Sequence, residues 1–401
     1  MPAQLAANNI KWESTNTLDI ALEGSLFNDR FNFSIGYFDK RNSDLLYNVT
    51  QPLSSGMNQN SGNNASILTN IGTMSNRGWE LQFGVDILRT RDWNWNFNID
   101  ASFVQNKILK LPNGKDIPGQ ALFQGKSIYE KYTYEFAGVD RVTGNSLYYM
   151  APDSPDYWII ADDGSHTFNQ AAYETNVRLA KASGHYFEYN GIPMTDRTDY
   201  AKRRTLGTSL PTVYGSFGTN LSWKGINLAM LFTYGLGGKS TNGNYQSLMS
   251  NNTAGALHKD ILNSWTEADA IPGYYDEAGN AVYFEHATLE DGTQIINNGD
   301  IDANGVPVND TYLSNYNNAS SSRWMVSNNY LTFKNLNINY NLPMKWVDAL
   351  KLQGINVGFS VDNLFIATRQ KGFNPQYSYS GGQGAYYVPS RVFSFQLNVK
   401  F

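Results

Sequence analysis

The stretch from Trp79 to Phe103, WELQFGVDILRTRDWNWNFNIDASF, decides the fold of this chain. Apolar side chains stand at every second position from Trp79 to Ile87 and again from Trp93 to Phe103, with polar residues or glycine between them. This period of two predicts strands with one apolar and one polar face. Because the two runs are separated only by the residues Arg89 to Asp92, they are predicted to form a hairpin.

The same alternation recurs along the chain and predicts about eleven strands. Several exceed the usual five or six residues and match the 9 to 11 residues of a tilted membrane strand. The predicted strands are Thr17–Leu26, Phe31–Tyr47, Trp79–Ile87, Trp93–Phe103, Ser127–Phe136, Asn145–Tyr149, Val213–Trp223, Ile226–Tyr234, Tyr330–Asn341, Gly354–Leu364 and Val392–Phe401.

The connections between these strands alternate between short and long. In an up-and-down sheet this alternation places every long loop at one end and every short turn at the other. Outer-membrane β-barrels have this layout, with long extracellular loops and short periplasmic turns. Two short helices are also predicted, at Gly255–Glu267 and, on a weaker pattern, at Asn169–Ala182. The long segments are 48–76, 107–126, 150–209, 235–329 and 365–391.

The composition fits a membrane barrel better than a soluble domain. Charged residues make up only 16% of the 401 residues, and aromatic residues make up 14%, so the rings need an environment other than a charged surface. The net charge of -5 shows no excess of positive charge with which to bind nucleic acid, so nucleic acid is excluded as a partner. No apolar run approaches the length of a membrane helix.

The polar face of the strands is rich in amides, as at Asn335, Asn337 and Asn339. About eleven or more strands enclose more volume than side chains can fill, so this face is expected to line a wet lumen while the apolar face meets lipid. Aromatic residues beside the short turns, such as Trp93 and Trp223, suit an interfacial belt. The alternative is a soluble or surface β-rich protein that binds carbohydrate or acts as an adhesin, without a channel.

The odd number of strands predicts that the chain is part of a larger barrel. The first and last strands would run in the same direction, whereas bacterial barrels close by antiparallel pairing. An unclosed edge in lipid would leave backbone groups unpaired. The absence of a signal-peptide pattern after Met1 agrees with this expectation.

Catalytic chemistry was sought and not found, so we expect no enzyme and no cofactor. With 0 Cys and 4 scattered His, thiolate chemistry and a histidine-based metal site are not expected. The acidic pairs Asp162-Asp163 and Glu290-Asp291 lack a second group to fix their geometry, which leaves an outer-membrane hydrolase as a weak alternative. The stretch Asp300 to Gly305 fits either an Asx-rich turn or an irregular calcium loop.

Aromatic residues in the long loops are candidates for contact with a substrate. They are suited to stacking on sugar faces or packing on peptide side chains, and equally to holding their own loops together. The candidates are Tyr148, Tyr149, Tyr157, Trp158, Tyr377, Tyr379, Tyr386 and Tyr387.

Several motifs resemble those of the SusC/RagA-type TonB-dependent outer-membrane transporters. The segment Asn70 to Leu81, NIGTMSNRGWEL, is the most specific of them. An acidic stretch common in that family is reduced here to Asp196-Arg197-Thr198, so no calcium site is carried over. The matching stretches are 11–20 (KWESTNTLDI), 37–46 (YFDKRNSDLL), 70–81, 136–145 (FAGVDRVTGN), 372–376 (GFNPQ) and 389–401 (PSRVFSFQLNVKF).

The resemblance implies an all-β, up-and-down antiparallel transmembrane barrel of about 22 strands, with residues 1–401 as its C-terminal part. It places the plug domain and the TonB box outside this chain. The implied function is TonB-dependent import of an oligosaccharide or peptide across the outer membrane. The implied partners are the N-terminal half of the barrel with its plug, the TonB complex through that half, a SusD-like surface lipoprotein lid and the lipid bilayer.

The alternating end of the chain resembles the assembly signal of outer-membrane proteins. The side chains that form this pattern are Phe393, Phe395, Leu397, Val399 and Phe401.

Overall fold

The computed structural model describes most of the chain. The described residues are 10–50, 66–70, 72–161, 163–250, 255–270, 272–275, 277–278, 281–283, 285–297, 299–369, 374–377 and 389–401. Among them, no helix is both long enough and apolar enough to cross a bilayer.

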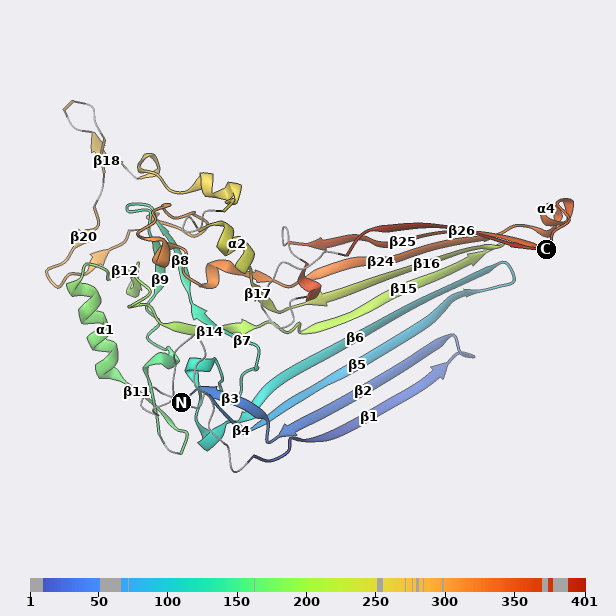
Figure 1. Ribbon diagram of the computed structural model, residues 1–401, viewed down its shortest axis with the longest axis horizontal. Helices are drawn as coiled ribbons and strands as arrows, with labels where there is room; N and C mark the ends of the chain where they lie inside the picture. The colour runs from blue at the N-terminus through green and yellow to red at the C-terminus, as the bar shows by residue number, and fades with distance from the viewer. Residues whose placement is uncertain are drawn as a thin grey trace.

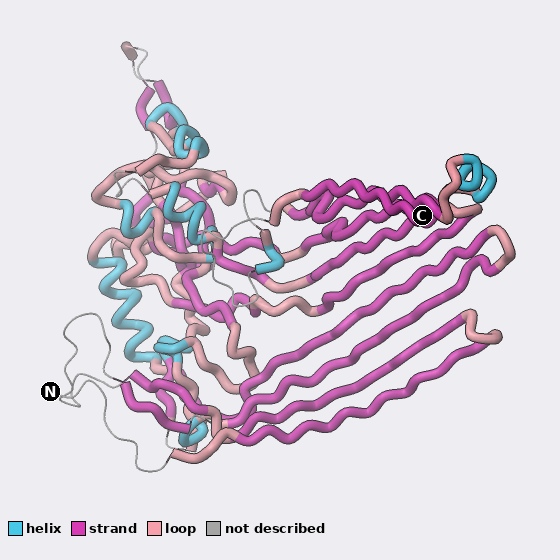
Figure 2. Tube along the Cα trace, turned by 45° about the vertical axis from the view of Figure 1, so that its right-hand side comes forward, coloured by secondary structure: helices cyan, strands magenta, loops and turns pink. Residues whose placement is uncertain are grey.

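A nine-stranded antiparallel sheet forms the wall of the molecule (Figure 1). Each strand pairs with the next wall strand along the chain, so the sheet is up-and-down, and Figure 2 shows that it is strongly curved. The predicted fold class is therefore confirmed. The wall strands are β1 (Ser14–Leu26), β2 (Phe31–Ser43), β5 (Thr73–Arg89), β6 (Trp93–Lys110), β15 (Val213–Trp223), β16 (Ile226–Leu236), β24 (Tyr330–Asn341), β25 (Gly354–Thr368) and β26 (Val392–Lys400).

The wall contains nine strands and not the predicted eleven. The stretches 127–136 and 145–149 instead contribute β7 (Glu130–Tyr134), β8 (Phe136–Asp140) and β9 (Ser146–Tyr149) to a separate layer. These strands have only four or five residues, too few to cross a bilayer. Nine is also odd, so the parity argument is unchanged: the edge strands β1 and β26 run in the same direction.

Short turns and long loops are segregated to opposite ends of the wall, as predicted (Figure 1). Lys224 and Gly225, which join β15 to β16, both have positive φ, of 46° and 88°. Such two-residue turns match the twist of paired strands. The connection between β24 and β25 is longer and contains the helix α4 (Met344–Ala349).

The loops pack into a layer at the other end of the wall, built around a seven-stranded sheet. In spatial order its strands are β20 (Ala287–Thr288), β21 (Gln294–Ile295), β12 (Phe187–Tyr189), β13 (Ile192–Thr195), β9, β8 and β22 (Ile301–Asp302). Five two-stranded pairs surround it: β3 (Leu46–Thr50) with β4 (Ser66–Asn70), β7 with β14 (Arg203–Thr208), β10 (Trp158–Ile160) with β11 (His166–Phe168), β17 (Lys239–Thr241) with β23 (Met325–Ser327), and β18 (Pro272–Tyr275) with β19 (Ala281–Tyr283).

The loop layer also contains short helices. The weaker of the two predicted helices is present as α1 (Gln170–Ala182), with Asn169 as its N-cap. The region 255–267 forms only 3₁₀ turns, η5 (Lys259–Asn263) and the start of η6 (Glu267–Asp269). The remaining helices are α2 (Gly243–Leu248), α3 (Ser314–Asn317), η2 (Pro112–Gly114), η3 (Pro118–Gln120), η4 (Pro155–Tyr157), η7 (Ser322–Trp324) and η8 (Pro375–Tyr377).

The buried apolar clusters lie in the loop layer and where it joins the end of β6, at Ile108. One cluster comprises Leu147, Phe187, Met194 and Ile296, all at most 3% exposed. On the wall, by contrast, apolar side chains such as Leu22 remain 64% exposed, and no described residues cover them. A soluble barrel would bury its apolar face in a core, so this distribution favours a face that meets lipid.

The motif Asn70 to Leu81 has a structural explanation at two glycines. Gly72 has φ of +125°, and a Cβ atom there would lie 1.9 Å from the carbonyl oxygen of Lys110. A Cβ atom on Gly78 would lie 1.9 Å from the carbonyl oxygen of Phe103. Any larger residue would therefore separate β5 from β6.

Candidate functional site

The polar face of the wall is continuous from strand to strand. The register places Glu23, Ser34, Gln82 and Asp100 in one row across β1, β2, β5 and β6. These residues line a hollow of about 750 Å³. The Asp100 carboxylate accepts a hydrogen bond of 2.8 Å from the backbone N–H of Ser216 on β15, and one from its hydroxyl. The face thus presents hydrogen-bonding groups to a wet lumen.

Amide side chains extend this polar face over the last strands of the wall. Asn335 Nδ2 donates to Asp362 Oδ1 at 2.7 Å, and Asn356 Nδ2 donates to Asn341 Oδ1 at 2.8 Å. Both bonds link β24 to β25. The amides predicted to line the lumen therefore also tie neighbouring strands together.

Aromatic rings dominate the opposite face. Phe217, Phe232, Phe333 and Phe365 stand on four neighbouring strands, with successive ring centroids 4.9, 4.3 and 5.8 Å apart. Beside the short turns, the indoles of Trp93 and Trp223 stack at 5.2 Å. This is the position in which an interfacial aromatic belt is expected.

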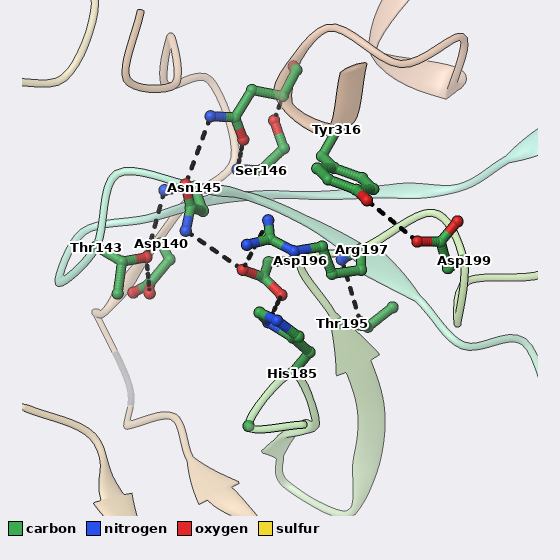
Figure 3. Close-up of polar contacts among 12 residues, drawn as sticks. Asp140, Thr143, Asn145, Ser146, His185, Thr195, Asp196, Arg197, Asp199 and Tyr316 are labelled. Atoms are coloured by element: carbon green, nitrogen blue, oxygen red, sulfur yellow. Dashed lines mark hydrogen bonds and ion pairs between the residues drawn. The ribbon is translucent and has the colours of Figure 1, made fainter. Parts of the chain in front are cut away.

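A polar cluster lies in the loop layer, where β9 and β13 pair (Figure 3). The Asp196 carboxylate, on a residue only 3% exposed, contacts His185 Nδ1 at 2.8 Å and Arg197 Nη1 at 3.4 Å. Asn145 Nδ2 also donates to Asp196 Oδ2 at 3.3 Å. Burial raises the pKa of Asp196, although the charges of Arg197 and His185 oppose this shift.

A second buried ion pair joins Asp140, in the motif FAGVDRVTGN, to His286. Asp140 also accepts a 2.6 Å hydrogen bond from Thr143 Oγ1 and one of 3.0 Å from the backbone N–H of Val142. Burial lowers the pKa of His286, but the hydrogen bond and charge of Asp140 outweigh burial, and the pKa of His286 lies above its ordinary value. Neither acid was singled out from the sequence as an ion-pair partner; Asp140 and His286 lie 146 positions apart.

Two of the candidate substrate-contact residues are buried in this layer. Tyr148 is 0% exposed, and its hydroxyl donates to the backbone oxygen of Tyr316 at 2.5 Å. Tyr157 is 2% exposed, and its hydroxyl accepts a 2.8 Å hydrogen bond from Asn176 Nδ2. Burial raises the pKa of Tyr148 to about 12. For these two rings the packing favours the alternative role, which is to hold the loops together.

Tyr149 and Trp158 are only partly buried, so their contact with substrate stays a prediction. Trp158 packs at 4.6 Å from the ring of His166. The side chain of Tyr377 and the whole of Tyr379, Tyr386 and Tyr387 lie outside the described residues. Contact of this second group with substrate therefore also stays a prediction.

Sequence reasoning missed a cluster of ion pairs between η4 and β14, made of two arginines and three acids. Arg203 binds Asp156 through Nη2 at 2.9 Å and lies 4.6 Å above the ring of Tyr132. Burial raises the pKa of Asp156, but the hydrogen bonds and the charge of Arg203 oppose it and the net pKa is lowered. Arg204 pairs with Glu135 and Asp153. The adjacent arginines were the only sequence signal for this cluster.

Among the described residues, no group of three or more potential ligands is arranged to hold a metal ion. Asp302 Oδ1 accepts from the backbone N–H of Asn304 at 2.9 Å, which is the Asx turn that was the alternative to a calcium loop. Asp291 pairs with Lys181 at 2.5 Å and not with another acid. Asp162 lies outside the described residues.

The residues of the predicted assembly signal occupy β26, at one edge of the wall. Phe395 is 82% exposed and its ring lies 4.9 Å from that of Phe359 on β25. The strand pairs only with β25 among the described elements. The signal itself stays a prediction.

Comparison with known proteins shows what this chain is similar to. A family described as "TonB dependent receptor-like, beta-barrel" matches residues 2–183. TonB-dependent receptor P39 of Formosa agariphila is 25% identical over 388 residues, covering 94% of this chain and 34% of that protein. TonB-dependent receptor SusC of Bacteroides thetaiotaomicron is 30% identical over 108 residues, covering 27% of this chain and 10% of that protein.

Solved structures give the same fold. The RagAB peptide transporter superposes with a TM-score of 0.65 at 20% identity, over 97% of this chain and 36% of that chain. The "open-open" state of the RagAB peptide importer superposes with a TM-score of 0.62 at 22% identity. The chain spans about a third of the length of the receptors that it matches along most of its length.

Proposed function

We propose, because this chain belongs to the TonB-dependent receptor-like β-barrel family, that it forms part of the wall of an outer-membrane importer. Its polar face lines the import route and its apolar face meets lipid. The cargo is an oligosaccharide or a peptide. Other parts of the same receptor supply the plug, the contact with TonB and the remaining strands of a barrel of about 22.

The observation that carries this proposal is the two-faced wall. One face exposes large apolar side chains, such as Leu22 at 64%, that no described residue covers. The other face presents the row of Glu23, Gln82 and Asp100 along a hollow. A soluble adhesin has no physical reason to leave so many large apolar side chains in water.

The unpaired edges of β1 and β26 support the proposal that further strands complete the barrel. Each edge strand has one neighbour in the sheet, and open edges in lipid leave backbone groups without hydrogen bonds. The loop layer at the mouth is the surface on which a SusD-like lipoprotein lid would sit. Both partners are part of the proposal.

The test is uptake by cells that carry the complete receptor. Radiolabelled maltohexaose and a radiolabelled casein digest are offered separately, with and without a proton uncoupler, and in a strain lacking TonB. We expect accumulation of one cargo that needs both the proton gradient and TonB. The proposal would be overturned if uptake needed neither the proton gradient nor TonB. It would also be overturned if the complete receptor stayed monodisperse in water without detergent.

A further inference from the structure

A partly open pocket lies where the polar face of the wall meets the loop layer. It has a volume of about 330 Å³ and is lined mainly by apolar groups, including Val104 on β6, Leu210 and Pro211. The rings of Tyr214 and Tyr330 form its wall side. The register places both tyrosines on the same face as Ser102, the face that carries Asp100. The pocket therefore opens on the proposed import route.

The described residues 374–377, between β25 and β26, contribute one side of this pocket. Gln376 lines it, and its Nε2 donates to Thr332 Oγ1 on β24 at 2.8 Å. Pro375, which is buried, lines the same side. The pocket is thus built jointly by the wall and a loop.

Asn328, on the floor of the pocket, is 6% exposed and incompletely hydrogen-bonded. Its Nδ2 donates to the backbone oxygen of Ser209 at 3.2 Å. Its Oδ1 has no hydrogen-bond partner among the described residues. A buried acceptor without a donor is costly, so a guest that supplies an N–H group would be stabilised there.

The chemistry of the lining selects one class of guest. None of the lining residues is charged, which disfavours an ionic group. A sugar ring would bring several hydroxyl groups that each need a partner, and a mostly apolar lining cannot satisfy them. An apolar side chain next to an amide N–H fits both the lining and the free Asn328 oxygen. A volume of about 330 Å³ has room for an apolar side chain and the peptide group beside it.

We infer that this pocket binds an apolar amino-acid side chain of a peptide cargo, with a rotated Asn328 amide accepting a hydrogen bond from the adjoining peptide N–H. The inference rests on the proposed function, since the pocket meets cargo only if cargo passes along the wall. It narrows the cargo from the two proposed classes to peptides with apolar residues.

The probe is the neutral tripeptide acetyl-alanyl-photoleucyl-alanine amide, cross-linked by light to the complete receptor in detergent and mapped by mass spectrometry. We expect cross-links at Val104, Tyr214 and Tyr330. Unlabelled acetyl-alanyl-leucyl-alanine amide should compete, and maltotriose should not. Three results would overturn the inference. The first is cross-linking confined to other sites, and the second is no cross-linking because another segment of the receptor fills the pocket. The third is equal competition by maltotriose.

Two variants test the pocket directly. Val104→Phe fills it and should reduce cross-linking at least about fivefold, whereas Val85→Phe adds the same ring to the opposite face of β5 and should not. Asn328→Leu removes the acceptor and should also weaken cross-linking about fivefold. Undiminished cross-linking in Val104→Phe refutes the site. If TonB-dependent uptake persists while the tripeptide fails to bind, the inference fails and the proposed function stands.

Discussion

Asp140 and His286, 146 positions apart, form an ion pair of 2.9 Å in which both side chains are at most 2% exposed. Asp140 ends β8, the strand next to the edge strand β22, and His286 immediately precedes β20, the other edge strand, so the pair links distant strands of the seven-stranded loop sheet. The loop layer is thus held by charge as well as by its apolar clusters.

This pair predicts a pH dependence of the loop layer. The pKa of His286 is raised above its unfolded value of about 6.5, so the stabilisation is complete below that pH. It is lost as the pH rises through the folded pKa, with a slope of at most about 1.4 kcal/mol per pH unit. Hydrogen exchange of residues 136–149, corrected for intrinsic rates, should show protection falling across this window. In His286→Gln the dependence should be flatter, and an unchanged profile would contradict the assignment.

Ile99 and its neighbours on β6 test which face meets lipid. Arginine on the lipid face near the midplane costs about 2 to 4 kcal/mol, whereas a hydrated lumen accommodates it. Ile99→Arg should therefore reduce the yield of folded receptor in vesicles much more than Asn98→Arg. Asn98 is a better control than Asp100, whose carboxylate holds Ser216. A water-soluble thiol reagent should label Asn98→Cys and not Ile99→Cys. The reverse pattern would show that the lipid-facing and lumen-facing sides have been assigned the wrong way round.

Gly78 and Gly84 offer a matched pair on one face of β5. A Cβ atom at Gly78 would lie 1.9 Å from the Phe103 oxygen, whereas one at Gly84 would have no atom within 4 Å. Gly78→Ala should force β5 from β6 and destabilise the barrel by about 3 kcal/mol or more, as overpacking does. Gly84→Ala should change stability by less than about 1 kcal/mol. The measurement is the urea midpoint for loss of the heat-resistant form in vesicles, and equal midpoints would refute the close approach.

The alternating residues of β26 are proposed to guide membrane assembly. Phe395→Asn should lower the amount of receptor inserted in cells, because the outward ring is lost from an 82% exposed position. Gln396→Asn, on the polar face of the same strand, should leave insertion unchanged. Surface labelling gives the inserted amount, and uptake divided by that amount gives activity per molecule. A loss of activity per molecule with normal insertion would assign Phe395 to transport instead.

The period-two pattern was sufficient to locate the wall strands. The bounds of β15 and β24 agree with those predicted from alternation, because long strands with two different faces leave a strong local signal. The helix α1 was likewise predicted, on a weaker pattern, over Asn169–Ala182. At 255–267 the apolar spacing indicated a helix, yet only 3₁₀ turns form there.

Because of the alternation at Ser127–Phe136, this stretch was wrongly counted as a wall strand. Local pattern cannot tell a strand that crosses a bilayer from one that packs in a loop layer, since pairing partners lie far away in the chain. β7 pairs with β14, more than 60 residues later, and β8 and β9 pair within the loop sheet. Tyr148 illustrates the consequence, because its burial follows from packing against Phe136 and Tyr134.

By itself the sequence determined the class of fold, the two faces of the wall and the separation of turns from loops, because these follow from periodicity and loop length, which are local properties. Only the tertiary structure decided which acids meet which histidines, which rings are buried and where Asn328 is left without a donor. Those features depend on how the loop segments pack, and two of them join segments more than 100 residues apart: the contacts of Asn328 with Ser209 and of Asp140 with His286.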